Sequence, residues 1–361
     1  MQELLSKLVS FQTTADNPEE IKKGFEYIAS LFDIEKFETQ IFEKNGKLSQ
    51  LISFKGKDAL KPKILLNGHF DVVPAEDDSQ YEMRVEGDRA LGRGTADMKG
   101  MAVVAIEVMQ ELAKKDSPPD VALLLNGDEE IGGENGVRYC VQEIGIKPQF
   151  VLCVDSTHSR KEIVVKEKGG LWLEIKVMGK TAHAAYLWNG ENAVEKLFEV
   201  IQKIKEFVGP VQPEAWKSTV NVGIIETPNK TPNKVPAEAT AVLDIRFTEG
   251  LAKTPDELFE KIQKLVPEVE LKALTRVFPL HADEKHPLVQ KLKQIADKAW
   301  GEDIPLHFGH GATDARFFAE VGVPAVLYGG IGDNYHGAGE WVDLKSLEQN
   351  KQILLELLKG T

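Results

Sequence analysis

Four short apolar runs constrain this chain more than any other feature, because each is followed by a histidine or a carboxylate. The runs cover residues 64–66, 121–125, 150–154 and 325–328. Short apolar runs bounded by glycine or polar residues are typical of buried parallel strands. The sequence therefore predicts an α/β fold in which several buried strands end next to polar side chains.

The polar residues that follow these runs are of the types that bind divalent metals. In open α/β sheets, ligands bind at the carboxyl ends of the strands. A single histidine at a strand end is more often structural, but four strands that each deliver an acid or a histidine favour a shared site. Histidines and carboxylates without cysteine suit zinc, cobalt or manganese. The residues are His69 and Asp71 after the first run, Asp128, Glu129 and Glu130 after the second, Asp155 after the third, and His336 after the fourth.

Composition and charge exclude several classes of protein. The chain has 361 residues, enough for two domains, and a formal net charge of −13. Phosphate binding needs a basic surface, so neither nucleic acid nor an anionic membrane is expected as a partner. The other interpretation of the negative charge is that it only keeps the protein soluble. Residues 1–10 do not form a signal peptide, and no apolar run reaches the roughly 18 residues of a membrane span. We expect a cytoplasmic protein in which Cys140 and Cys153 are buried free thiols.

The N-terminal part of the chain combines helical and strand patterns. Residues 1–32 carry apolar positions at helical spacing and are predicted to be helical. Residues 36–54 alternate, which predicts two strands joined by a turn at residues 45–46. An apolar helix is predicted over residues 101–112, so capping of this helix is one interpretation of Asp97.

The middle of the chain has a different organisation. Its elements follow the order strand, helix, strand, strand, helix, strand, which is the ferredoxin-like order. They cover residues 171–178, 192–208, 218–226, 239–247, 255–266 and 269–278. A helix over residues 287–300 and a core strand over residues 321–327 return to the α/β pattern. The sequence thus predicts a large domain of residues 1–168 and 282–361, with a smaller domain of residues 169–281 inserted into it.

Three motifs that contain many of these polar residues follow one another along the chain. They are G-H-F-D-V-V-P at residues 68–74, G-R-G-T-A-D-M-K-G at residues 92–100 and G-D-E-E-I-G-G at residues 127–133. Together with T-A-H-A-A, D-I-R-F and Y-H-G-A-G-E, they resemble the signatures of the aminoacylase/carboxypeptidase family of two-zinc hydrolases. That family includes acetylornithine deacetylase, succinyl-diaminopimelate desuccinylase and several dipeptidases. The resemblance covers essentially the whole chain, and it implies a mixed-sheet zinc-hydrolase catalytic domain with an inserted ferredoxin-like α+β lid or dimerisation domain.

The resemblance assigns a ligand role to five residues. It implies that His69 and Asp155 bind one zinc ion, that Glu130 and His336 bind the other, and that Asp97 bridges the two. Each ion would then have two ligands of its own and one shared carboxylate, which suits an open catalytic zinc site. Under this interpretation Asp97 is a ligand and not a helix cap. The same ligands also accommodate cobalt or manganese.

Catalytic roles follow from the same resemblance. Glu129 directly precedes a ligand and is interpreted as the general base that later protonates the leaving amine. Asp71 is predicted to accept the N–H of the His69 ring and to fix its tautomer. His183 resembles a histidine that reaches into the partner's active site in dimeric relatives and stabilises the oxyanion. The proline usual shortly after that histidine is replaced within residues 185–187, so this loop departs from the family's pattern.

Three further residues are candidates for binding the substrate. Asn233 and Arg246 resemble the family's binders of the substrate carboxylate, and arginine suits bidentate recognition of a carboxylate. The alternative for Arg246 is an ion pair on the strand surface. Gly309 begins the loop of residues 309–314, which is the next place to look for a carboxylate site.

The function implied is a metal-dependent amidohydrolase that cleaves an amide next to a free carboxylate. Deacylation of an N-acyl amino acid is the preferred reaction, and a carboxypeptidase or dipeptidase acting on short peptides is the alternative. An inactive binding protein that retains the fold is an alternative of another class. Two divalent metal ions per chain, with zinc preferred, and a homodimer are expected.

Overall fold

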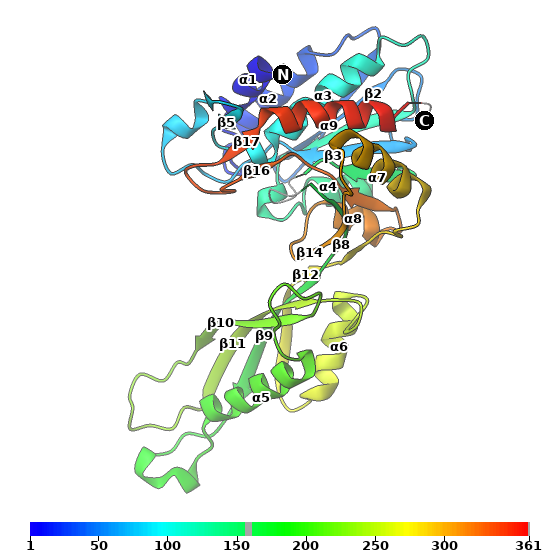
Figure 1. Ribbon diagram of the computed structural model, residues 1–361. Coiled ribbons are helices and arrows are strands. Elements are labelled where there is room, and N and C mark those ends of the chain that lie inside the picture. The colour runs from blue at the N-terminus through cyan, green and yellow to red at the C-terminus, as the bar shows by residue number, and fades with distance from the viewer. Residues whose placement is uncertain (156–160, 360–361) are drawn as a thin grey trace. The chain divides into compact units, whose positions relative to one another are not determined.

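The computed structural model describes residues 1–155 and 161–359 and divides into two compact units (Figure 1). The larger unit, which we call the large domain, contains Met1–Lys166, His281–Gly309 and Thr313–Thr361. The smaller unit, the inserted domain, contains Glu167–Leu280 and His310–Ala312. The chain thus passes between the two domains at residues 166/167 and 280/281. The sequence predicts these two junctions at residues 168/169 and 281/282.

A mixed sheet forms the centre of the large domain. Among the described residues it has nine strands in the order β1-β2-β6-β3-β7-β15-β8-β13, with β14 paired to β8. The four apolar runs of the sequence become β3, β6, β7 and β15, and they pair in parallel as β6-β3-β7-β15. The strands of the large sheet are β1 (Phe37–Lys44), β2 (Lys47–Phe54), β3 (Ile64–His69), β6 (Val121–Asn126), β7 (Phe150–Cys153), β8 (Ile163–Glu167), β13 (Leu280–His281), β14 (Leu306–Gly309) and β15 (Ala325–Leu327).

Helices and a small second sheet complete the large domain. The small sheet has the order β16-β17-β5-β4. None of the helices in the described residues is long and apolar enough to cross a membrane. The remaining elements are α1 (Gln2–Val9), α2 (Pro18–Ser30), β4 (Arg84–Glu86), β5 (Arg89–Leu91), α3 (Gly100–Leu112), α4 (Val137–Tyr139), α7 (Pro287–Trp300), α8 (Ala315–Glu320), β16 (Gly332–Asp333), β17 (Trp341–Asp343) and α9 (Leu344–Leu357).

The parallel strands are buried on both faces, which explains why they are continuously apolar. Successive side chains of a strand point to opposite faces. Ile64 and Leu66 of β3 join the main core, which also contains most of α3, whereas Leu65 between them is buried on the other face. Helix α3 is buried almost all round, as expected of a helix that is apolar on every side. The core therefore holds the carboxyl ends of β3, β6 and β7 in fixed positions.

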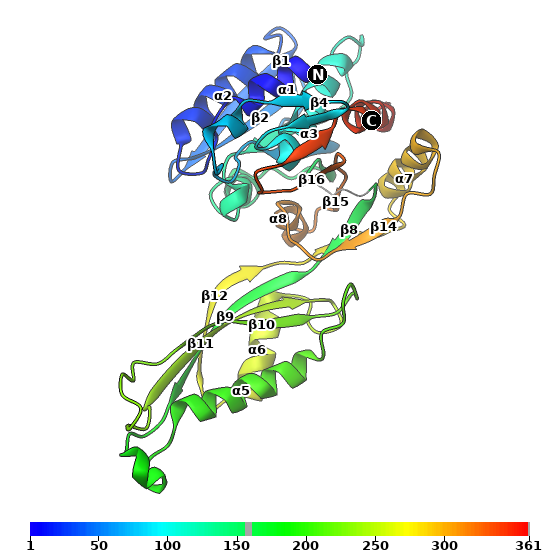
Figure 2. The ribbon, with the colours of Figure 1, turned by 60° about the vertical axis from the view of Figure 1, so that its left-hand side comes forward.

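The inserted domain has the predicted ferredoxin-like order. Its elements are β9 (Gly169–Met178), α5 (Ala193–Val208), β10 (Thr219–Glu226), β11 (Glu238–Phe247), α6 (Pro255–Leu265) and β12 (Glu270–Val277). The sheet order is β10-β11-β9-β12, and all its pairs are antiparallel. Both helices cover the same face of this sheet (Figure 2), where the alternate side chains of β9 and β11 form a separate core. The structure thus confirms the predicted mixed-sheet α/β fold with an inserted α+β domain.

Local chemistry explains where several of these elements begin. Asn45 and Gly46 have φ values of 50° and 75° between β1 and β2, so this hairpin uses the tight left-handed turn that Asn-Gly favours. The side chain of Asn192 accepts hydrogen bonds from the N–H groups of Val194 and Glu195 and caps α5. Thr254 caps α6 in the same way.

Two predicted elements of the large domain are wrong in extent. Residues 1–32 do not form one helix, because α1 ends at Val9 and α2 begins at Pro18, a residue that cannot continue a helix. The loop between them is anchored from a distance, since Thr13 Oγ1 donates to the Phe70 carbonyl oxygen at 2.6 Å. The predicted strand over residues 321–327 begins only at Ala325, after a turn in which Gly322 has φ 76°. Cys140 and Cys153 are buried thiols, as predicted.

Candidate metal centre

Four of the five predicted ligands come from segments that follow the parallel strands or precede α3, and the fifth, His336, lies in the loop between β16 and β17. His69 is the last residue of β3, Glu130 lies in the 3-10 turn Glu129–Ile131 after β6, and Asp155 lies two residues past β7. Asp97 lies in the segment Thr95–Lys99 that leads into α3. Parallel strands place their carboxyl ends at one edge of the sheet, where ligands bind in open α/β folds.

Asp97 is the centre of this group, because its two carboxylate oxygens face different histidines. Asp97 Oδ1 lies 3.0 Å from His69 Nε2, and Asp97 Oδ2 lies 3.3 Å from His336 Nε2. The His69 nitrogen also lies 3.6 Å from Asp155 Oδ1, and the His336 nitrogen lies 3.2 Å from Glu130 Oε2. The residues therefore divide into two sets, each with one histidine and one carboxylate, that share Asp97.

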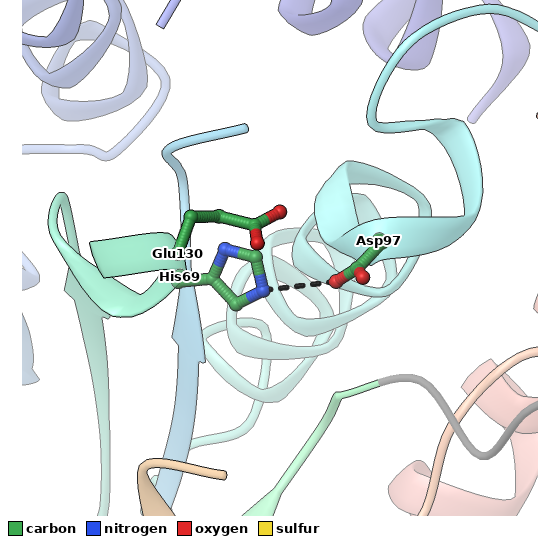
Figure 3. A group of neighbouring side chains, drawn as sticks. All are labelled: His69, Asp97 and Glu130. Carbon is green, nitrogen blue, oxygen red and sulfur yellow. Dashed lines mark hydrogen bonds and ion pairs between the residues drawn. The ribbon is translucent and has the colours of Figure 1, made fainter. Parts of the chain in front are cut away.

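This donor set fits divalent metal ions. One ligand atom from each of His69, Asp97 and Glu130 lies within 4.8 Å of the others, and the three side chains converge from separate segments (Figure 3). Glu130 Oε1 is buried and has no hydrogen-bond partner among the described residues, so it is an acceptor that lacks a positive partner. Helix capping does not account for Asp97, since the N-cap residue of α3 is Lys99. Imidazole and carboxylate donors suit zinc, cobalt or manganese.

The electrostatics of the group also favour a cation. Burial lowers the pKa of His69, but hydrogen bonds with Asp155, Asp71 and Asp97 outweigh it and hold that pKa well above its usual value. Hydrogen bonds with Asp97 and Glu130 raise the pKa of His336 to about 10. Protons thus supply positive charge to the cluster when no metal does, and metal binding would release them.

Glu129 and Glu130 differ in what surrounds them. Burial, together with the charges of nearby acids, raises the pKa of Glu129 well above its usual value. Burial also raises the pKa of Glu130, but a hydrogen bond with His336 opposes this. Glu130 therefore contacts a member of the cluster, whereas Glu129 is a half-buried carboxyl that is driven toward its protonated form. A base of raised pKa is suited to proton transfer near neutral pH.

Asp71 contacts the site differently from the prediction. The nearer acceptor for His69 Nδ1 is the backbone carbonyl of Asp71 at 3.0 Å, and the Asp71 carboxylate is 3.5 Å away. That carboxylate instead accepts the backbone N–H groups of Glu129 at 3.2 Å and Glu130 at 3.0 Å. Asp71 thus orients the imidazole mainly through its backbone, and its side chain holds the turn that carries both glutamates.

Two buried charged residues next to the site were missed in the sequence. Arg93 and Glu340 form an ion pair with 2.7 Å between Arg93 Nη1 and Glu340 Oε2, and both side chains are 1% exposed. Glu340 follows His336 by four residues in Y-H-G-A-G-E. No local signal could have found the pair, because a motif does not show which of its charged residues become buried.

The remaining predicted residues lie in the inserted domain or at the end of β14. His183 is exposed, and its Nδ1 accepts the N–H of Ala185 at 3.1 Å. The segment with Asn233 pairs with the segment after His183, since the Ala184 N–H donates to the Asn233 carbonyl oxygen at 2.9 Å. Gly309 ends β14 and is half-buried.

Arg246 already has an acidic partner on its own strand. Asp244 Oδ1 lies 2.8 Å from Arg246 Nε, and Asp244 Oδ2 lies 3.1 Å from Arg246 Nη2. Residues two apart on a strand share a face, so this pair follows directly from the D-I-R-F motif. The ion pair that was the alternative interpretation of Arg246 is therefore present in the structure. The third guanidinium nitrogen, Nη1, lies near Gly170.

Comparison with known proteins gives relatives that match over most of the chain. A succinyl-diaminopimelate desuccinylase from Maricaulis maris is 27% identical over 339 residues, which is 87% of this chain and 85% of that protein. An acetylornithine deacetylase from Buchnera aphidicola is 24% identical over 336 residues, or 87% of this chain and 84% of that protein. The crystal structure of an M20 family metallo-carboxypeptidase from Sulfolobus solfataricus has the same fold, with a TM-score of 0.77, 19% identity and coverage of 98% and 97% of the two chains.

The family-level match includes all of the strands that carry the candidate ligands. The sequence pattern of peptidase family M20/M25/M40 matches residues 65–360, which is far more than half of the chain. It contains the three motifs and the shared carboxylate of Asp97, and it confirms the resemblance inferred from them. On this match, the chain belongs to peptidase family M20/M25/M40.

Proposed function

We propose that this chain is a metal-dependent amidohydrolase that removes the acyl group from an N-acyl amino acid with a free carboxylate. The observation that carries the proposal is the division of the Asp97 oxygens between His69 and His336, at 3.0 and 3.3 Å. A shared carboxylate between two histidine-carboxylate sets suits a pair of metal ions. The desuccinylase and the deacetylase among the relatives support deacylation over other amide chemistry.

The five residues of the cluster would hold the metal ions. His69 and Asp155 would serve one ion, Glu130 and His336 the other, and Asp97 both, with zinc as the expected metal. Such ions polarise the scissile carbonyl and lower the pKa of a water molecule. Asp71 would orient residues of both metal positions. Its backbone carbonyl orients His69, and its carboxylate holds the N–H groups of Glu129 and Glu130.

Glu129 would transfer the protons. It removes one proton from the attacking water as the water oxygen bonds to the amide carbon. It then delivers that proton to the leaving nitrogen as the C–N bond breaks, so that the products are a carboxylic acid and an amine. The raised pKa of Glu129 supports both steps, since a carboxyl must accept and release a proton near working pH.

The inserted domain would recognise the substrate. Arg246 and Asn233 would bind the substrate carboxylate, with Gly309 at the end of β14 in the large domain as a further contact. His183 would stabilise the oxyanion in the active site of the partner subunit of a homodimer. The hydrogen bond from the Ala185 N–H to His183 Nδ1 supports this role, because a neutral His183 then carries its proton on Nε2 and can donate it.

Metal content and a substrate panel together test the proposal. Purified protein should contain zinc or another divalent metal and should hydrolyse some members of a panel of N-acetyl and N-succinyl amino acids. The panel should include dipeptides and carboxy-terminal peptide substrates, because the metallo-carboxypeptidase fold keeps a carboxypeptidase or dipeptidase as the second candidate. Hydrolysis of peptides alone would select that candidate, and metal binding without any hydrolysis would favour an inactive binding protein.

A further inference from the structure

Glu340 is a buried carboxylate whose two oxygens both contact the segment that carries Asp97. Oε1 accepts the backbone N–H groups of Ala96 at 2.9 Å and Asp97 at 3.1 Å. Oε2 accepts the N–H of Gly94 at 2.9 Å and Nη1 of Arg93 at 2.7 Å. Three of these donors are backbone N–H groups and the fourth is the Arg93 side chain. Glu340 therefore fixes the backbone of this segment and is not oriented as a further metal ligand.

Arg93 extends the same contact to the segment that carries His336. Its Nη2 donates to the backbone carbonyl oxygen of His336 at 2.9 Å. His336 has φ 62°, a left-handed conformation that costs a non-glycine residue about 1 kcal/mol or more and persists only when its surroundings impose it. The arginine therefore holds the backbone of a strained residue whose imidazole contacts Asp97 and Glu130.

The position of this ion pair argues for a role in the site. A buried ion pair is weak support for overall stability, because desolvation of both charges offsets their attraction. Glu340 and Arg93 nevertheless join two segments that are distant in sequence, and each segment carries a candidate ligand. Asp97 receives one contact from Glu340 through its N–H, and His336 receives one from Arg93 through its carbonyl.

We propose that Glu340 and Arg93 are positioning residues that preorganise Asp97 and His336 for metal binding. This inference rests on the proposed function. An ion at Glu130 and His336 would depend on two of the positioned residues, Asp97 and His336, whereas an ion at His69 and Asp155 would depend on Asp97 alone. Loss of the ion pair therefore weakens the first of these positions more than the second.

Stepwise binding of Co²⁺ to chelator-treated protein tests this, because the visible absorption of Co²⁺ reports coordination without an activity assay. The variant Glu340→Gln keeps the size of the side chain, but its amide group presents donors to two of the four N–H groups that Glu340 accepts. We expect one of the two Co²⁺ affinities, that of the position with Asp97, Glu130 and His336, to fall roughly 10- to 100-fold, the usual effect of removing a residue that orients a ligand. The other affinity should change less, and the absorption spectrum of the doubly loaded protein should shift.

The second variant, Arg93→Lys, keeps the positive charge beside Glu340 and loses the forked contact to the His336 carbonyl. It should weaken only the position that uses His336, and it keeps the inference testable if Glu340→Gln does not fold. The control is Glu107→Gln in the same domain, which removes ion pairs of 2.6 Å with Lys351 and with the N-terminal amine of Met1, outside the cluster. This control should leave both Co²⁺ affinities and the spectrum unchanged.

Three results would overturn the inference. The first is a folded Glu340→Gln protein whose two affinities and spectrum match those of the wild type. The second is an equal loss in Glu107→Gln, which would make the effect one of general stability. The third is a wild-type protein that takes up no Co²⁺ or other divalent metal, which would remove the proposed function and this inference with it.

Discussion

The carboxylate of Asp71 holds the backbone of Glu129, with 3.2 Å between Asp71 Oδ1 and the Glu129 nitrogen. The other oxygen, Oδ2, accepts the N–H of Glu130 at 3.0 Å. One side chain from the end of β3 therefore fixes the turn that presents two adjacent carboxyls. Because adjacent side chains diverge, one of them can contact the metal cluster while the other remains available to a water molecule.

Glu129→Gln should abolish most turnover while both metals stay bound. The amide cannot accept a proton, so the rate should fall by about 10²–10⁴, the usual contribution of general acid–base catalysis. Turnover and metal content, measured on the same preparation, check this expectation.

The matched variant is Glu130→Gln, one residue along the same turn. Glu130 Oε2 lies 3.2 Å from His336 Nε2, so this variant should lose metal as well as activity. The opposite pattern, with metal lost from Glu129→Gln and kept by Glu130→Gln, would show that the two roles are exchanged.

Chelation should remove the activity reversibly. The candidate ligands are nitrogen and oxygen atoms of five side chains, and the raised pKa values of His69 and His336 let protons offset part of the carboxylate charge when no metal is present. Exhaustive dialysis against chelator should therefore leave a folded, inactive protein, and added Zn²⁺ or Co²⁺ should restore turnover. Metal analysis by mass spectrometry accompanies the assay, and full activity in protein shown to lack metal would refute a metal-dependent mechanism.

The sequence predicts the strand ends and the candidate residues that lie together around Asp97, because both depend on local patterns. Apolar runs of five residues predict β6 and β7, and the polar residues that follow them converge once the strands pair in parallel. The hairpin at Asn45 and Gly46 was also predictable, since two left-handed residues in succession favour Asn-Gly. In these cases the local structure is determined by a few adjacent residues.

What the sequence does not reveal depends on contacts between distant segments. Glu340 and Arg93 are 247 positions apart, and no local pattern distinguishes their buried pair from two solvated charges. Asp71 was correctly placed beside His69, but a motif cannot show that its carboxylate serves the turn after β6 instead. The break after Val9 is a different case. Pro18 is a local signal for the start of a new helix, but the helical spacing of apolar residues on both sides of the break favoured one continuous helix.

Asp314 should make the metal-free protein less stable as the pH rises. It is 1% exposed, its Oδ2 accepts a hydrogen bond from Asn126 Nδ2 at 3.2 Å, and its Oδ1 has no partner among the described residues. Burial raises its pKa to about 8, with Asp128 adding to the effect and Arg316 opposing it. The unfolded chain loses this proton near pH 4 and the native state only near pH 8, so the contribution of Asp314 to stability declines across that interval.

Asp314→Asn cannot ionise, so this variant should lose less stability between pH 5 and pH 8 than the wild type does. The expected difference is at least about 1 kcal/mol, because each unit by which the native pKa exceeds the unfolded one contributes about 1.4 kcal/mol of pH-dependent stability. Urea unfolding of chelator-treated protein at the two pH values measures it, and Asp116→Asn at an exposed position is the control. Parallel pH profiles for Asp314→Asn and wild type would contradict the prediction.

His183 should act across a dimer interface. If it does, His183→Ala and Glu129→Gln should each be inactive alone, and mixing them after dissociation should restore activity. A hybrid dimer has one site with both wild-type groups, so random reassociation should recover about a quarter of the wild-type sites. Sedimentation at the assay concentration supplies the oligomeric state, and a fully active monomer would refute a role across the interface.

Arg246 should bind the substrate carboxylate even though Asp244 already contacts two of its nitrogens. Asp244 holds Nε and Nη2, which orients the guanidinium and leaves Nη1 on the side of Gly170. Arg246→Ala should lower kcat/KM by about 10²-fold or more without changing metal content, since a charge-assisted contact is lost at roughly 1.4 kcal/mol per tenfold. Replacing the substrate carboxylate by a carboxamide should cost a similar factor in the wild-type enzyme.

The decisive measurement for Arg246 combines these two changes. If the carboxylate and Arg246 contact each other, the carboxamide should cost little further in Arg246→Ala, because both changes remove one interaction. Asp244→Ala distinguishes carboxylate binding by Arg246 from a purely structural ion pair. This variant breaks the ion pair but leaves the guanidinium, so it should reduce kcat/KM less than Arg246→Ala does. Equal losses in Asp244→Ala and Arg246→Ala, with additive effects of the carboxamide, would show that the ion pair itself is what matters. The carboxylate would then bind elsewhere, with Gly309 and the loop after it as the next segment to mutate.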